Sequence, residues 1–182
     1  DTLYCDEISS EKRKSCINLL GIILDVLLKW FAPILSFTTE EIFQIISKEK
    51  NSSIHLQDFP SIPKKWNNEK LFEKWDKFKV VRKVVNAAIE VKRSNKDIGS
   101  SLEADVQIYL NDEYFNITKN FDLPENFITS KAEAKKLIND SAFFKLEEVE
   151  GVQVSVKKAE GTKCPRCWKI FTGPCVRCEA KY

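Results

Sequence analysis

The sequence predicts an α+β protein in which a helical bundle segment is followed by a small α+β region and a short cysteine-rich tail. Three observations support this fold class. Apolar residues recur at three- and four-residue spacing through much of residues 10–95, and from residue 102 they alternate with polar ones. These are the periods of helices and of half-buried strands. Four of the six cysteines then fall between residues 164 and 178.

The composition is that of a soluble globular chain. Of its 182 residues, 43% are hydrophobic and 31% are charged, enough for one medium domain or two small ones. The longest apolar run, residues 19–28, contains Gly21 and Asp25 and is too short to span a bilayer, so we expect no membrane partner. The chain starts at Asp1 and has no methionine, so we expect a piece of a longer protein. The clustering of four of its six cysteines is not that of a disulfide framework and fits a reduced metal site in the cytoplasm.

Two helices are expected within residues 1–50. The first covers residues 10–32, with Ser10 as the N-cap and an apolar stripe, and Pro33 ends it. The stripe consists of Ile17, Leu20, Leu24, Leu27, Leu28 and Phe31. The second helix follows at once, because Thr38 and Glu41 have the spacing of a capping box. A connection this short makes the two helices neighbours in a bundle.

Residues 51–66 read as a linker, since they contain Asn, Ser, Pro60 and Pro63. A long helix is then expected from 67 to 95 within a segment 67–101 that Gly99 closes. Residues 102–160 form the small α+β region. The expected strands cover 104–110 and 152–156, with 127–129 as a possible third, and the possible short helices are 112–119 and 131–139.

Charge is uneven along a chain whose net charge is only +2. Residues 64–97 hold eleven Lys/Arg and five Asp/Glu, and residues 157–182 hold seven and two, so these segments carry +6 and +5. Two basic surfaces on a near-neutral chain indicate a polyanionic partner, although two solvated faces explain them equally well. The basic residues of the long helix that lie off its apolar face are candidate RNA contacts: Lys79, Arg82, Lys83 and Arg93.

The cysteines of residues 161–182 predict a structural zinc knuckle. Cys164 and Cys167 form one C-x-x-C pair, and Cys175 and Cys178 form another. Two such turns supply the four thiolates that a tetrahedral zinc ion prefers, and they leave no position open for a reactive water. A redox or disulfide pair is the competing interpretation, but the βαβ context of a redox C-x-x-C is absent. We expect one zinc ion per chain.

Side chains around these cysteines suit an RNA ligand. Trp168 directly follows the second cysteine, and three further candidate contacts are Arg166, Lys169 and Arg177. An aromatic ring beside arginines is typical of stacking on an unpaired base with phosphate contacts alongside. Packing of Trp168 against the α+β region is an equally good explanation of the same pattern. No residue pattern in the chain indicates a catalytic site.

Four stretches and the cysteine tail carry a family resemblance. The stretches are DTLYCD at 1–6, LKWFAPILSFTTEEIF at 28–43, SIHLQDFP at 53–60 and residues 75–109 with VRKVVNAAIEVKRSNKDIGSSLEADVQIY, and the tail has KCPRCW followed by CVRC. In this order they resemble segments of the bacterial-type isoleucyl-tRNA synthetases, such as RLYCD, LAPILSFTAEEIW and SVHLxDxP. The resemblance covers nearly the whole chain. The segment between the two cysteine pairs is shorter than is typical of the family, and nothing resembles its HIGH or KMSKS signatures.

The resemblance implies a C-terminal fragment of this ligase. Residues 1–50 would end its anticodon-binding helical bundle, 67–101 would be its junction helix, and 161–182 its four-cysteine zinc knuckle, in which Arg166 and Trp168 serve the anticodon region. Its partners would be tRNA(Ile) and the remainder of a monomeric synthetase. The parent enzyme would activate isoleucine with ATP, which only the missing catalytic domain uses, and transfer it to tRNA.

Two alternatives belong to other functional classes. A similar zinc knuckle ends the formamidopyrimidine-DNA glycosylases, but the helical segments here do not fit those proteins. The second alternative is a structural or protein-interaction zinc module with no direct RNA contact. A salt-dependent affinity for tRNA would separate the RNA-binding interpretation from this one.

Overall fold

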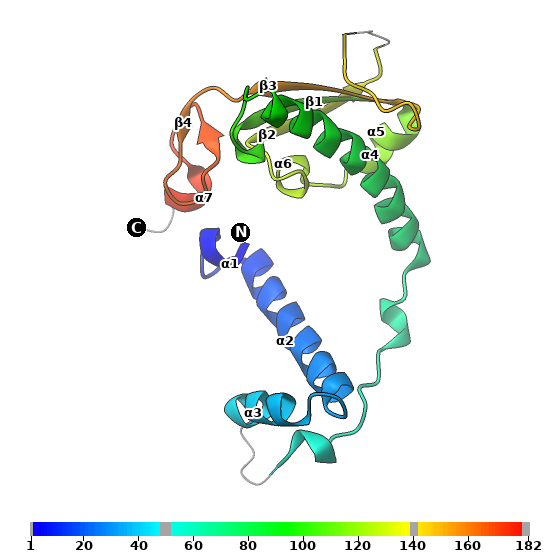
Figure 1. The fold of residues 1–182 in the computed structure, drawn as a ribbon, viewed down its shortest axis with the longest axis vertical. Helices are drawn as coiled ribbons and strands as arrows, with labels where there is room; N and C mark the ends of the chain where they lie inside the picture. The colour runs from blue at the N-terminus through cyan, green and yellow to red at the C-terminus, as the bar shows by residue number, and fades with distance from the viewer. Residues whose placement is uncertain (1, 48–51, 139–141, 180–182) are drawn as a thin grey trace. The chain divides into compact units, whose positions relative to one another are not determined.

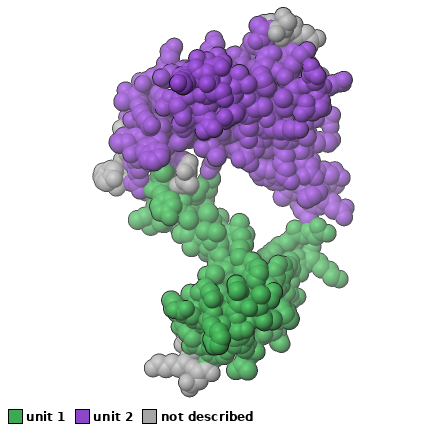
Figure 2. All heavy atoms as spheres, viewed as in Figure 1, with its two compact units in different colours: residues 1–67, 180–182 green, residues 68–179 purple. Residues whose placement is uncertain are grey.

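The computed structural model describes residues 2–47, 52–138 and 142–179. The chain divides into two compact units, which meet in sequence between Asn67 and Asn68 (Figure 2). The first unit is helical, and the second combines one long helix with a small sheet (Figure 1). The α+β fold class predicted from the sequence is therefore confirmed.

The described residues of the first unit form three α-helices and two 3-10 helices. They are α1 (Thr2–Cys5), α2 (Glu11–Phe31), α3 (Ser36–Ile46), η1 (Ile54–Leu56) and η2 (Lys64–Trp66). As predicted, Ser10 caps α2, and its side chain accepts a hydrogen bond from the Arg13 N–H. The predicted start of α3 at Thr38 is wrong. The helix begins at Ser36, and the preceding Leu35 makes no side-chain cap. The helix starts this early because the tight turn after α2 already directs the chain into helical geometry.

The core of the first unit is small. Leu28, Ala32 and Ile54 are buried together, with Ile42 and Phe43 packed against them. Ile54 belongs to the segment expected to be a linker, and its side chain is only 2% exposed. The apolar residues predicted to form a stripe on α2 do lie within that helix, but most of them are exposed. Ile17, Leu20, Leu24, Leu27 and Phe31 are each more than a third exposed.

The long helix of the second unit is α4 (Glu69–Ser94), close to the range predicted. Asn68 caps it by accepting a hydrogen bond from the Leu71 N–H. The helix ends before Lys96, whose φ of 62° is in the left-handed region that terminates helices. Its buried face recurs at three- and four-residue spacing and consists of Phe78, Val81, Val84, Val85, Ala88 and Ile89.

A three-stranded sheet packs against α4. After a short η3 (Ser101–Glu103) come β1 (Ala104–Leu110), α5 (Asp112–Thr118), α6 (Leu123–Asn126), β2 (Lys131–Lys136) and β3 (Val152–Lys158). The strand order is β2-β1-β3, with β1 parallel to β2 and antiparallel to β3. Val106, Ile108 and Val154 are at most 1% exposed and share one core with the apolar face of α4.

Two of the weaker secondary-structure predictions are wrong. Residues 127–129 are not a strand, because Phe127 caps α6 and Ile128 has a φ of 56° that turns the chain. Residues 131–139 are not a helix, since residues 131–136 form β2 and residue 139 lies outside the described part of the chain. Lys, Ala and Glu favour helices locally, but pairing with β1 and burial of alternate side chains outweigh that preference.

Candidate metal centre

A short hairpin presents the first cysteine pair. Strands β4 (Thr162–Lys163) and β5 (Ile170–Phe171) pair in antiparallel fashion. Between them the Cys164 N–H donates to the Lys169 carbonyl at 2.9 Å, and the Trp168 N–H donates to the Cys164 carbonyl at 3.0 Å. These bonds fold residues 164–169 into a tight knuckle. Gly161, directly before β4, has a φ of 127°. A Cβ at this position would lie 2.0 Å from the Phe171 carbonyl oxygen, so only glycine fits.

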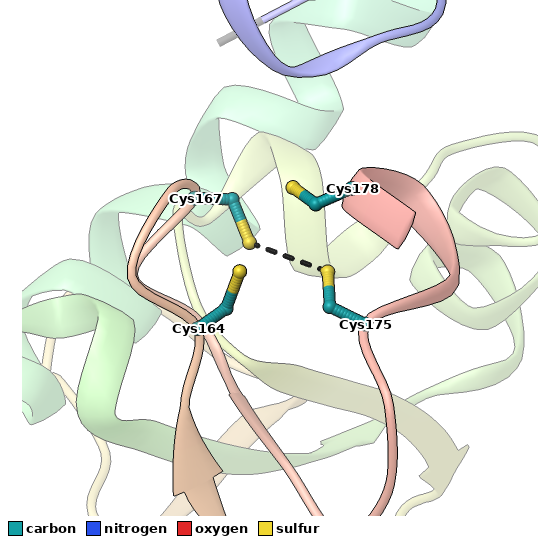
Figure 3. A group of neighbouring side chains, drawn as sticks. All are labelled: Cys164, Cys167, Cys175 and Cys178. Atoms are coloured by element: carbon teal, nitrogen blue, oxygen red, sulfur yellow. Dashed lines mark hydrogen bonds between the residues drawn. The ribbon is translucent and has the colours of Figure 1, made fainter. Parts of the chain in front are cut away.

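The second pair lies on a single turn of helix. Helix α7 (Val176–Glu179) begins directly after Cys175, and the Cys178 N–H donates to the Cys175 carbonyl at 2.9 Å. Figure 3 shows the four thiols pointing toward a common centre from the two turns. All four are buried, and their sulfur atoms lie within 4.8 Å of one another. The Cys167 and Cys175 sulfurs are 3.6 Å apart.

This arrangement fits a tetrahedral zinc ion. With zinc–sulfur bonds of about 2.3 Å, neighbouring sulfurs of a tetrahedron lie about 3.8 Å apart. The Cys167–Cys175 separation is already close to that value, and the other sulfurs need only small movements. Among the described residues, this is the one group of three or more Cys, His, Asp or Glu side chains whose ligand atoms converge in this way.

Burial sets the proton affinity of these thiols. It raises the pKa of Cys167 and, more strongly, the pKa of Cys178. Burial also acts to raise the pKa of Cys164, but hydrogen bonds from the backbone N–H groups of Cys167 and Arg166 and from the Cys167 and Cys175 thiols together outweigh it and lower that pKa to about 7. A metal ion binds thiolates, so it must displace protons from Cys167 and Cys178.

Trp168 is strained and exposed. Its φ of 63° lies in the left-handed region, which costs an L-residue about 1–2 kcal/mol. The side chain is 59% exposed, and the Lys163 ammonium lies 5.8 Å from the centroid of its ring. A tryptophan whose role is to pack would be covered, and a strained position with an open side chain would otherwise favour glycine. More than half of the ring is therefore left uncovered by the α+β region.

The predicted basic residues of the knuckle differ in exposure. Arg166 is exposed, and Arg177 is half-buried. Lys169 is only 9% exposed, and its Nζ donates to the Pro124 carbonyl at 3.4 Å. Burial lowers the pKa of Lys169, and the charge of Arg177 acts in the same direction. Lys169 thus contacts the α+β region instead of pointing into solvent.

Ser130 forms a hydrogen bond to the knuckle hairpin that the sequence analysis did not predict. Its Oγ accepts a hydrogen bond from the Ile170 N–H at 2.6 Å and donates one to the Leu102 carbonyl at 2.5 Å. A serine at the start of a strand has no distinctive sequence signal, because its partners are 28 and 40 residues away.

Most of the predicted basic residues on α4 are already paired. Lys79 contacts Asp76 at 2.9 Å, and Lys83 contacts Glu148 at 3.2 Å. Arg93 forms two hydrogen bonds to the Glu90 carboxylate, at 2.9 and 3.0 Å. Arg82 is exposed and makes no ion pair within residues 2–47, 52–138 and 142–179. Within those same residues, no helix is long and apolar enough to cross a membrane.

Known proteins with similar sequences are tRNA ligases. Residues 1–108 match the family described as the anticodon-binding domain of tRNA ligase. The chain is 49% identical over 177 residues to the isoleucine–tRNA ligase of Pelagibacter ubique, an alignment that covers 97% of the chain and 18% of that protein. It is 41% identical over 186 residues to the enzyme of Rhodopseudomonas palustris, covering 100% and 18%. The enzyme of Caldanaerobacter subterraneus is 37% identical over 175 residues, covering 92% and 19%.

The chain spans less than a fifth of the length of these curated relatives. The family match covers more than half of the chain, and the sequence resemblance to isoleucyl-tRNA synthetases is borne out by relatives that align along 92–100% of it. The chain therefore belongs to the anticodon-binding domain family of the tRNA ligases.

Proposed function

We propose that this chain is the tRNA-recognition region of an isoleucine–tRNA ligase and that it binds the anticodon region of tRNA(Ile). In this proposal the parent enzyme activates isoleucine with ATP in another part of the protein and transfers it to tRNA. The relatives, all named isoleucine–tRNA ligase, support the choice of amino acid. The reduced cysteine cluster suits the cytoplasm, where thiols stay reduced.

The observation that carries the proposal is the conformation of Trp168. Its ring projects from a rigid turn at a backbone position that costs free energy, and more than half of the side chain is open to solvent. Strain of this kind persists where it serves a function. An open indole ring stacks on any unpaired base, and Arg166, two residues earlier on the exposed side of the knuckle, supplies a guanidinium for the base or its phosphate.

The zinc ion has a structural role in this proposal. Cys164, Cys167, Cys175 and Cys178 would hold one ion, and four thiolates leave no open position for catalytic water. The ion would lock the two turns together and fix the backbone on the N-terminal side of Trp168. Arg177 lies between the ligands of the second turn, where its charge helps to offset the formal charge of −2 on a zinc tetrathiolate centre.

Helix α4 offers a second contact surface for the phosphate backbone. Lys79, Lys83 and Arg93 form exposed ion pairs, which are worth little in water, so RNA phosphates can replace their carboxylate partners. Arg82 has no such partner to lose within the described ranges. We therefore expect Arg82 to contribute more to phosphate binding than the other three.

Equilibrium binding to tRNA(Ile) and to a non-cognate tRNA, measured across a salt series, tests the proposal. We expect tighter binding to tRNA(Ile) and a steep loss of affinity with salt for both RNAs, because phosphate contacts dominate affinity while base contacts distinguish sequences. Equal affinities for tRNA(Ile) and the non-cognate tRNA would refute the proposed recognition of the anticodon. If neither tRNA bound at low salt, the region would be a structural or protein-interaction module.

A further inference from the structure

We propose that Ser130 and Lys169 are positioning residues that hold the zinc knuckle at a fixed orientation on the α+β region, so that Trp168 is presented to RNA from a rigid surface. This inference rests on the proposed function of Trp168. The inference adds a second requirement to that function: the knuckle must be anchored to the sheet as well as folded around its metal.

Ser130 joins three segments that are far apart in the sequence. Its hydroxyl accepts from the Ile170 N–H in β5 and donates to the Leu102 carbonyl, just before β1. Its own N–H donates to the Ala104 carbonyl at 3.1 Å. Ser130 is 7% exposed, so water does not readily replace these bonds. The serine therefore ties the last strand of the knuckle to the first strand of the sheet.

Lys169 provides a second tie from the adjacent residue. Its ammonium group donates to the Pro124 carbonyl in α6, and its side chain is covered along the way. Ile170, next in the chain, is 7% exposed. Two consecutive residues directly after Trp168 are thus attached to the α+β region. The residue directly before it, Cys167, belongs to the metal site, so the backbone of Trp168 is held on both sides.

Such anchoring matters because it removes an entropic cost of binding. A knuckle that folds around zinc but swings on its connection to the sheet must be immobilised when RNA binds. Ordering one mobile group costs a factor of about 2–10 in affinity. Anchoring by Ser130 and Lys169 removes that cost in advance without any contact between these two residues and RNA.

Thr129 provides a matched control for Ser130. It is the preceding residue, it is fully buried, and its Oγ1 has no hydrogen-bond partner among the described residues. Thr129→Val removes this hydroxyl at nearly constant volume and is expected to be neutral. Ser130→Ala also removes one buried hydroxyl, but this one joins the knuckle to the sheet. A difference in tRNA affinity between the two variants therefore measures the effect of the hydrogen bonds that join the knuckle to the sheet through Ser130.

The test uses the complete natural protein loaded with zinc. We expect Ser130→Ala to weaken tRNA(Ile) binding by about 2- to 10-fold, to leave the salt slope and zinc content unchanged, and to speed hydrogen exchange at the Ile170 amide. Thr129→Val should match the wild type. Unchanged affinity in Ser130→Ala would refute the anchoring role, as would a loss of affinity that only follows a loss of zinc.

Lys169→Met separates positioning from direct phosphate contact. This variant keeps the apolar stem and removes the charge. A positioning residue lowers affinity at an unchanged salt slope, whereas a phosphate contact lowers the slope by roughly one unit or less. A lowered slope would therefore contradict the inference. Trp168→Ala serves as the reference: if it too binds normally, the proposed function has failed, and if it alone binds weakly, only the anchoring inference has failed.

Discussion

Replacing Trp168 with glycine should separate folding from RNA binding. At a φ of 63° the wild-type residue carries about 1–2 kcal/mol of backbone strain, which glycine does not have. Glycine offsets part of this gain through about 0.5–1 kcal/mol of extra entropy in the unfolded chain. About two fifths of the indole is covered, so both Trp168→Gly and Trp168→Ala lose some packing, and Trp168→Ala is the reference for stability. We therefore expect the knuckle of Trp168→Gly to be as stable as that of Trp168→Ala or more stable by up to about 1 kcal/mol.

RNA binding should fall in both variants. Stacking of one base on an aromatic ring contributes about 1–3 kcal/mol, so Trp168→Gly should weaken tRNA(Ile) binding by about 5- to 150-fold. The assay compares tRNA affinity, zinc content and melting temperature in the same samples. Trp168→Ala is the control, because it removes the ring and keeps the strain. Wild-type affinity in a glycine variant that retains its zinc would refute the stacking role, and a melting temperature below that of Trp168→Ala would refute the strain argument.

Four other perturbations test the remaining structure. Chelation of the metal should expose the amides of residues 162–179 to hydrogen exchange while α4 and the sheet, whose core is separate, stay protected; continued protection of the tail would contradict a metal-dependent fold. Zinc affinity, measured by competition with a chelator, should keep rising with pH from about pH 6 to beyond pH 8, because burial raises the pKa values of Cys167 and Cys178 above that of a free thiol and protons compete with the ion below those pKa values. Arg82→Gln should lower the salt slope of tRNA binding by roughly one unit or less and Lys83→Gln by a smaller amount, since Lys83 is paired with Glu148; equal slopes would refute this ranking. Phe78→Ala should destabilise the second unit by about 3–5 kcal/mol in denaturant unfolding, since Phe78 is fully buried and stacks on Phe121 and Phe127.

Features set by local sequence were predicted well. The spacing of apolar residues gave the extent of α2 and α4, and the side chain of Ser10 caps its helix as expected. The alternation of Val152, Val154 and Val156 identified β3. The four cysteines converge because each C-x-x-C turn is a local structure that aims two sulfurs to the same side. Each of these signals depends on residues only a few positions apart.

Features set by distant partners could not be predicted from these patterns. The sequence KAEAKK of β2 has strong helix formers, and it becomes a strand because β1 offers hydrogen bonds and a core for Ala132 and Ala134. The same limit hid Ser130, whose partners Leu102 and Ile170 come from other elements. It also concealed the burial of Lys169, which the sequence placed among the solvent-facing cations.

The charge of α4 shows how this limit affects functional inference. A count along the sequence assigns +6 to residues 64–97, but some of the compensating carboxylates come from outside that segment. Glu148, 65 residues after Lys83, pairs with it, and Glu113, 36 residues after Lys77, pairs with that lysine. The net positive charge around the helix is therefore smaller than its composition indicates, and among the four candidate contacts Arg82 is the one without an ion pair in the described residues. A polyanion that binds this unit would find less competition from carboxylates at Arg82 than at Lys83. In the proposed function α4 therefore has a supporting, sequence-independent role, and base recognition is proposed for the knuckle.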